Sequence, residues 1–239
     1  MKPRILGLTL FVVLSGATVL SQTGRVSAHG DVTPQPVDTT GLPELGEEWA
    51  DENPWRDPSK PEWKLAVQKG ASGFNQNCAR CHGLEAVSGG TAPDLRFLEA
   101  NSDGDSWFME RFTKGYAQGG ITKMPAFGEL LGQKAGWAIR TYIETRPDEG
   151  ALDEHQTALK SVKQKLADYL SQGKKPSDVE ADLKSIKEEL SAIAVKVKTG
   201  SGAPIADSVA SRTATLLDGS PDSIKHAEEA LTIGLSAAK

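Results

Sequence analysis

The chain has 239 residues, and 25% of them are charged, with a formal net charge of −5. No region concentrates the basic residues, which excludes a nucleic-acid-binding protein that depends on a basic face. Residues 29–62 contain nine acidic and two basic residues, residues 63–147 contain eight acidic and ten basic residues, and residues 148–239 contain fifteen acidic and twelve basic residues. The charges therefore divide the chain into an acidic arm, a nearly neutral region and a mildly acidic tail.

The N-terminus has the pattern of a secretory signal peptide. Lys2 and Arg4 precede a mostly apolar run over residues 5–20, and small residues lead up to Ala28. This run of about 16 residues is short for a membrane span, which needs about 20. We expect cleavage between Ala28 and His29 and export to a bacterial periplasm. No later segment could span a membrane, so no span is expected after processing.

The acidic arm covers residues 29–61 and contains six prolines. A segment with so few apolar residues cannot build a hydrophobic core of its own. It nevertheless contains Trp49 and Trp55, whose large apolar rings favour a packed environment. We expect both indoles to pack on the domain that follows, with packing on a partner protein as the alternative.

A helix is expected to run from about Pro61, with Ser59 as its N-cap, to the five residues 78–82, which read C-A-R-C-H. A C-x-x-C-H run is the attachment motif of a c-type haem. The two thiols can bond to the two vinyl groups of the porphyrin, and the histidine that follows can then ligate the iron. The chain has no other cysteine.

Two other interpretations of the cysteine pair lack support in the sequence. A thioredoxin-like disulfide would need a βαβ pattern around the pair, and the sequence shows none. A zinc site would need a second pair of ligands, and none follows. The motif therefore predicts one covalently bound haem c, attached through Cys78 and Cys81, with His82 as an axial ligand of the iron.

Residues 134–145 predict a second helix, which Pro147 ends. The two helices resemble those of class I cytochromes c, in which an N-terminal helix crosses a C-terminal one. The resemblance implies that a glycine and three aromatic residues meet at the crossing, namely Gly70, Phe74, Trp137 and Tyr142.

Met124 is the candidate for the second axial ligand, because a thioether is a soft ligand that favours ferrous iron and raises the reduction potential. Pro125 follows it and stiffens the loop that presents the sulfur. Met109 falls in a segment that predicts a helix, so we expect it in the core. The competing ligands are His155, His226 and a lysine. With both axial positions filled, no site is left for a substrate, so an electron-transfer protein is expected rather than an enzyme.

Pro93 lies eleven residues after His82. In class I cytochromes c, a proline carbonyl at about this spacing accepts a hydrogen bond from the axial histidine and fixes its ring. The resemblance implies this role for Pro93. The alternative is a turn proline without any contact at the haem.

The tail predicts a set of helices without a cysteine or a cluster of metal ligands. The first helix covers the apolar stripe between Leu152 and Tyr169 and is broken at Gly173 and Pro176. The second begins near Ser177, with a capping box to Glu180. Its apolar residues have heptad spacing: Val179, Leu183, Ile186, Leu190, Ile193 and Val197.

We expect these two helices to form an antiparallel hairpin, followed by two shorter helices at about residues 204–217 and 221–237. Two roles for the tail stay open at this point. It is either a bundle that stabilises the haem domain or a module for docking or oligomerisation.

Two segments extend the family resemblance. Residues 29–35 (HGDVTPQ) and 73–85 (GFNQNCARCHGLE) resemble the PedF-type cytochromes c, and the resemblance covers about residues 29–146. These cytochromes are associated with periplasmic alcohol dehydrogenases that use pyrroloquinoline quinone (PQQ). The resemblance implies a carrier that accepts single electrons from such a dehydrogenase and passes them to a downstream cytochrome or terminal oxidase.

The expected fold class is all-α, a class I cytochrome c haem domain with an extended N-terminal arm and a C-terminal helical bundle or hairpin. The expected division is a signal peptide at 1–28, the arm at 29–61, the haem domain at 62–147 and the helical domain at 148–239. The acidic arm is expected to steer a basic partner surface. Two alternative functions are a haem-based gas or redox sensor with the tail as its output, and a cytochrome subunit held permanently in a dehydrogenase complex.

Overall fold

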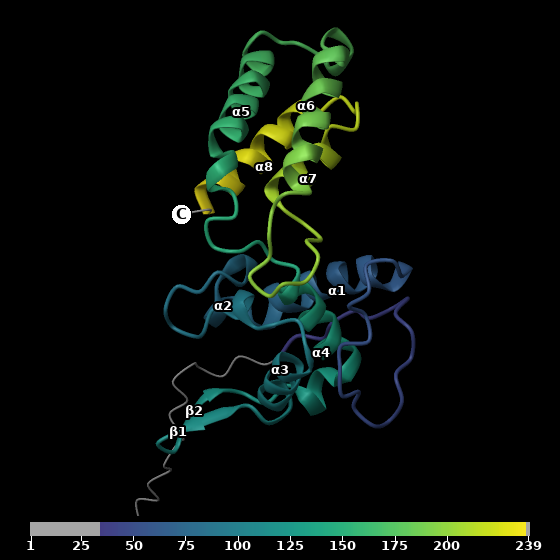
Figure 1. Ribbon diagram of the computed structural model, residues 1–239, viewed down its shortest axis with the longest axis vertical. Helices are drawn as coiled ribbons and strands as arrows, with labels where there is room; N and C mark the ends of the chain where they lie inside the picture. Colours follow the sequence, from purple (N-terminus) through teal and green to yellow (C-terminus); the bar gives the residue numbers. More distant parts are fainter. Residues whose placement is uncertain (1–33, 238–239) are drawn as a thin grey trace, which may run out of the picture.

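The computed structural model describes residues 34–237, and most of them are helical (Figure 1). The α-helices in chain order are α1 (Pro61–Asn77), α2 (Ala79–His82), α3 (Ser102–Lys114), α4 (Gly128–Glu144), α5 (Gln156–Ser171), α6 (Glu180–Ala194), α7 (Val209–Leu216) and α8 (Ser223–Ala237). A two-stranded antiparallel sheet pairs β1 (Tyr116–Gln118) with β2 (Ile121–Met124). The predicted all-α class is confirmed. The predicted signal peptide and its cleavage between Ala28 and His29 lie outside the described residues.

The crossing of α1 over α4 is the most extensive helix contact in the described part of the chain. Gly70 makes it possible, because a Cβ at this position would lie only 1.9 Å from the carbonyl oxygen of Ala138. The rings of Phe74 and Tyr142 meet 5.4 Å apart, and Trp137 is fully buried. The residues expected at the crossing are therefore found there, and α4 follows the predicted second helix after a kink at Gly132.

The arm packs on this helix pair. Trp55 is 3% exposed and belongs to a hydrophobic cluster with Trp137 and Ala138. Trp49 lies nearer the surface, with its ring 6.3 Å from that of Phe112. The prediction that both indoles pack on the haem domain is confirmed. The arm packs its apolar side chains into the core of the haem domain because it has too few of them to build a core of its own.

Two predicted helix caps do not form, because neighbouring carboxylates take over the local hydrogen bonds. Ser59 donates its backbone N–H and its hydroxyl to Asp57, at 2.9 and 2.7 Å, instead of capping α1. Ser177 lies in a short 3-10 turn in which Asp178 accepts a backbone N–H. Helix α6 then begins after Val179 without a side-chain cap.

The tail helices enclose a separate hydrophobic core. The heptad stripe of α6 points into it, together with apolar residues of α5, α7 and α8. The stripe is therefore used within the chain and does not form an oligomerisation surface. Helices α5 and α6 run in opposite directions as predicted, but their main packing partners are α8 and α7, and α8 lies between them in the view of Figure 1. The hairpin expected from the sequence is thus completed by the two later helices.

The tail also touches the haem domain. An isolated bridge pairs Pro147 with Thr199, and the N–H of Ala100 donates to the carbonyl of Ser201 at 3.0 Å. The division of the chain near residue 147 stays a prediction. Within residues 34–237, none of the helices combines the length and the apolar character that a membrane crossing needs.

Candidate haem site

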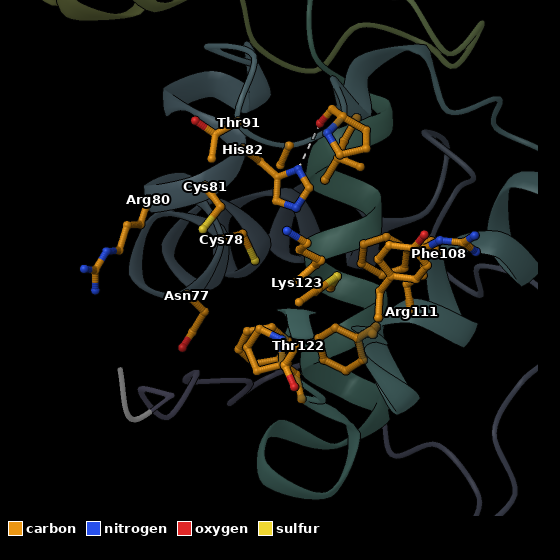
Figure 2. A pocket seen from close by; sticks show the side chains of 18 of the residues that line it. Asn77, Cys78, Arg80, Cys81, His82, Thr91, Phe108, Arg111, Thr122 and Lys123 are labelled. Atoms are coloured by element: carbon orange, nitrogen blue, oxygen red, sulfur yellow. Dashed lines mark hydrogen bonds between the residues drawn. The ribbon is translucent and has the colours of Figure 1, made fainter. Parts of the chain in front are cut away.

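The C-x-x-C-H motif forms one tight helical turn at the end of α1. The N–H groups of Cys81 and His82 both donate to the carbonyl of Cys78, at 3.1 and 3.0 Å. This turn brings both thiols and the imidazole to one side of the chain, where they line a single pocket. Figure 2 shows these three side chains beside one another on one wall of that pocket.

The ring of His82 is held through its Nδ1 atom by a backbone carbonyl. Its Nδ1 lies 2.9 Å from the carbonyl oxygen of Pro93, the residue that the family resemblance named for this contact. A carbonyl accepts a hydrogen bond, so Nδ1 carries the proton and Nε2 keeps a free lone pair. Burial lowers the pKa of His82, and the neutral ring is the form that ligates a metal.

The rest of the pocket lining includes residues of α3, of the β-hairpin and of the loop between the hairpin and α4. Met124, the last residue of β2, lines the pocket together with several aromatic side chains. These are Trp107, Phe108, Phe112, Tyr116 and Phe127.

The pocket fits a covalently attached haem. Its volume is about 750 Å³, within the range of pockets that enclose cofactors. Aromatic rings line it, as a macrocycle with an apolar face requires. The two thiols, one imidazole and one thioether that a c-type haem needs all reach the same space.

The competing axial ligands are placed elsewhere, with one exception. His155 precedes α5 and His226 lies on α8, and neither lines the pocket. Met109 packs against the cores on either side of α3. Lys123 does line the pocket, so a lysine is the competitor that the structure leaves beside Met124.

The hairpin that carries Met124 was not predicted. The sequence suggested only a loop stiffened by Pro125, whereas the structure pairs Met124 with Tyr116 across the sheet. Two adjacent residues with positive φ, Gly119 and Gly120, connect the strands. A Gly-Gly pair between two short strands is a known hairpin signal and could have revealed it.

Cys78 and Cys81 are both partly buried in the pocket wall. Burial, with a smaller contribution from the neighbouring Cys81, raises the pKa of the Cys78 thiol to about 12. Cys78 and Cys81 do not form a disulfide in the described structure. A thiol kept protonated in this way reacts slowly as a nucleophile.

Three basic side chains that the sequence analysis did not assign to the site also line the pocket: Arg80, Arg111 and Lys123. The guanidinium of Arg111 stacks on the ring of Trp107 at 3.9 Å. Among the described residues that line the pocket, none is aspartate or glutamate. The pocket therefore has a basic rim, composed of these three residues, although the whole chain is acidic.

Comparison with known proteins identifies the family. The chain is 54% identical over 134 residues to a cytochrome c550 of Pseudomonas aeruginosa, and the match covers 56% of this chain and 90% of the relative. The chain belongs to the cytochrome c family. As a cytochrome c it binds a c-type haem covalently and carries electrons, and its relationship to cytochrome c550 implies an exported protein.

Two further comparisons add detail to this cytochrome c. Residues 65–143 match the family model described as cytochrome c oxidase, cbb3-type, subunit III. The chain is also 33% identical over 94 residues to the quinohemoprotein alcohol dehydrogenase ADH IIB of Pseudomonas putida, which covers 38% of this chain and 13% of the relative. No solved structure matches the chain significantly.

Proposed function

We propose that this cytochrome c is a periplasmic carrier that accepts single electrons from a PQQ-dependent alcohol dehydrogenase and passes them to a downstream cytochrome or terminal oxidase. The observation that carries this proposal is the single pocket that brings together Cys78, Cys81, His82 and Met124. Each of these side chains has a chemical part in holding one haem between two protein ligands.

Cys78 and Cys81 are assigned the two thioether bonds, and the helical turn between them fixes their spacing. Pro93 holds Nδ1 of His82 at 2.9 Å, which sets the tautomer and the plane of the ring, so that Nε2 would be the atom offered to the iron. Met124, which lines the same pocket, would offer its sulfur as the second ligand. Bound haem supplies a one-electron iron couple, and the soft sulfur ligand favours the reduced state.

Two protein ligands would leave no coordination position for a substrate. The aromatic wall keeps water from the site, and a low-dielectric surrounding tunes the reduction potential. The chain then has only to exchange electrons through its surface, which a small, transient interface permits.

The partner assignment is supported by one relative. A protein whose name combines a quinone, a haem and alcohol dehydrogenation contains a stretch that is 33% identical to this chain. In that relative the similar stretch belongs to the same polypeptide as the dehydrogenase. We infer that the present chain serves a comparable dehydrogenase as a separate protein.

We assign the surface that docks on the redox partner to the basic rim, in place of the acidic arm that was expected from the sequence. Arg80, Arg111 and Lys123 line the pocket, whereas no acidic residue of the described arm lines it. An acidic partner surface would complement this rim, speed the encounter at low salt and fix the orientation of the haem edge.

Absorption spectroscopy of the exported protein, oxidised and reduced, with and without carbon monoxide, tests the ligand assignment. We expect a low-spin ferric spectrum, sharp reduced bands and no change with carbon monoxide. A high-spin ferric spectrum or a ready shift with carbon monoxide would mean an open or labile position, and the sensor would then be the better interpretation.

Stopped-flow reduction by a purified PQQ-dependent alcohol dehydrogenase tests the partner. We expect rapid, saturable reduction of the haem when the dehydrogenase has its alcohol, and none without it. A haem that stays oxidised with the active dehydrogenase, yet is reduced by a small-molecule donor, would refute the partner assignment and leave electron carriage intact.

A further inference from the structure

We propose that a segment of the tail, residues 199–212, positions the axial ligand His82. This brace segment, as we call residues 199–212, contacts both stretches of chain that hold the histidine: the loop after it, residues 83–87, and the stretch 93–97 that contains Pro93. The inference rests on the proposed ligation of the haem iron by His82. It gives the C-terminal helices a role at the haem that the family match, which ends at residue 143, does not contain.

The loop at residues 83–87 has a strained backbone. Glu85 and Ala86 both adopt positive φ, at 58° and 62°, a region that side chains other than glycine rarely occupy. Gly83 turns the chain so tightly that a Cβ there would lie 1.9 Å from the carbonyl oxygen of Val87. Such a conformation persists only when surrounding contacts hold it.

A chain of four alternating charges supplies these contacts. The carboxylate of Glu85 lies 2.7 Å from Arg146 at the end of α4 and 3.3 Å from Arg212 on α7. Asp207, just before α7, reaches the same two guanidinium groups at 3.4 and 2.6 Å. Arg146 is almost fully buried and stacks on Tyr142. Two members of this network, Asp207 and Arg212, belong to the brace segment.

The second stretch is held through Arg96. Its guanidinium pairs with Asp94 at 2.7 Å, and Asp94 directly follows the Pro93 carbonyl that faces His82. Gly200 of the brace segment packs on this stretch, since a Cβ there would lie 2.8 Å from the Arg96 carbonyl oxygen. The next residue, Ser201, accepts the N–H of Ala100 at 3.0 Å.

The two stretches are also linked to each other. Ser88 directly follows the loop. Its hydroxyl donates to the carbonyl of Ala92, and the backbone N–H of Ser88 donates to the Asp94 carboxylate at 3.4 Å. The brace segment, the loop and the Pro93 stretch therefore form one connected frame around His82. Loosening the frame frees the orientation of the imidazole, on which the strength of an axial ligand and the reduction potential depend.

The test compares Arg212→Gln with the control Lys225→Gln in the full-length, haem-loaded protein. Both variants remove one positive charge from a tail ion pair, but Lys225 pairs with Glu229 on the surface of α8. We expect Arg212→Gln to speed amide hydrogen exchange across residues 83–97 by about tenfold, which is the effect of losing one charged hydrogen bond. We also expect a shifted reduction potential in this variant and neither change in Lys225→Gln.

Glu85→Gln and the double variant with Arg212→Gln keep the inference testable if Arg212→Gln folds poorly. We expect Glu85→Gln to shift exchange and potential in the same direction, and the double variant to add less than the sum of the two single changes. Unchanged exchange and potential in haem-loaded Arg212→Gln and Glu85→Gln would overturn the inference alone. A wild-type chain without covalent haem or histidine ligation would instead overturn the proposed function on which the inference rests.

Discussion

Met124 is the residue on which the chemical character of the proposed site depends most. Met124 lines the same pocket as His82, and its place at the end of β2 is fixed by pairing with Tyr116. We expect Met124→Ala to open one coordination position, lower the reduction potential and let the ferrous protein bind carbon monoxide. Optical titration with carbon monoxide and a potentiometric titration measure both effects.

Met109→Ala is the matched control for that substitution. Met109 packs into the core and does not line the pocket. We expect it to lower the free energy of unfolding by about 2–4 kcal/mol through the cavity that it leaves, with an unchanged haem spectrum. A Met124→Ala protein that still excludes carbon monoxide would show that another side chain, such as Lys123, occupies the position.

Asp38 provides a prediction about pH. Its hydrogen bonds with the Lys69 ammonium and with Thr40 hold the pKa of Asp38 well below its ordinary value of 3.8. A carboxyl whose pKa is depressed by folding stabilises the fold above that ordinary value, and the contribution is lost as the pH falls below it. Between about pH 5 and about pH 2 we expect wild type to lose more stability than Asp38→Asn, as measured by denaturant unfolding.

Asp51→Asn, an exposed aspartate of the same arm, is the control for the pH series. It should follow the wild-type curve. If Asp38→Asn also followed that curve, the pair with Lys69 would not contribute to the docking of the arm on α1.

At the level of elements, the crossing of α1 and α4 depends on one missing side chain. A Cβ on residue 70 would lie 1.9 Å from a backbone carbonyl, which cannot move aside as a flexible side chain would. We expect Gly70→Ala to destabilise the protein by about 3 kcal/mol, at the upper end of overpacking effects. Gly46→Ala, at a loop position with no atom within 4 Å, should change stability far less in the same thermal or denaturant unfolding.

The helices of both halves could be predicted because their apolar residues repeat with helical spacing, as in the stripe from Val179 to Val197. The motif at residues 78–82 and Met124 could be recognised as candidates because few residue types can hold a haem. The hairpin was missed because its strands are too short for an alternating pattern to stand out. The predicted caps at Ser59 and Ser177 failed because nearby aspartates organise the turns before the helices: Asp57 accepts from Ser59 and Asp178 accepts from Lys175.

The buried polar contacts between the arm and the haem domain could not be predicted from the sequence either. Arg56 reaches two carboxylates that are fully buried, Asp105 at 2.6 Å and Glu144 at 3.1 Å. Asn53 of the arm donates its backbone N–H to Asp105 at 2.9 Å and its side-chain amide to Glu144 at 3.0 Å. Arg140 also pairs with Asp105, at 2.9 Å. These partners are distant in sequence, so no local pattern could have indicated them.

This buried network gives a prediction for the arm. Arg56→Ala would leave two buried carboxylates to share Arg140, and removing one partner of a buried ion pair is costly. We expect a loss of about 2–3 kcal/mol in unfolding free energy, reduced from the fully buried case because Arg56 is partly exposed. Lys134→Ala, which breaks a pair with the exposed Glu44, should cost below about 1 kcal/mol. Equal losses in the two variants would contradict the importance of the network.

At the level of the whole molecule, the tail is attached to the haem domain by contacts that join very distant positions. Arg212 and Glu85 are 127 residues apart, and Arg146 and Asp207 are 61 apart. Periodicity and motif spacing describe only neighbours along the chain, so the sequence left the role of the tail open. The structure places the loop between α6 and α7, together with α7 itself, against the part of the chain that carries the C-x-x-C-H motif, which is why a role at His82 could be inferred.

The distribution of charge over the whole molecule determines which residues steer the redox partner. The three residues of the basic rim belong to the pocket lining, whereas the exposed acids of the described arm do not. We expect Arg80→Gln with Lys123→Gln to slow reduction by the dehydrogenase about tenfold at low ionic strength, with the difference vanishing at high salt because screening removes steering. Asp51→Asn with Glu52→Gln removes two charges of the opposite sign and should leave the rate near that of wild type. Stopped-flow kinetics over a salt series measures this, and a slower rate in the arm variant alone would restore the acidic arm as the steering surface.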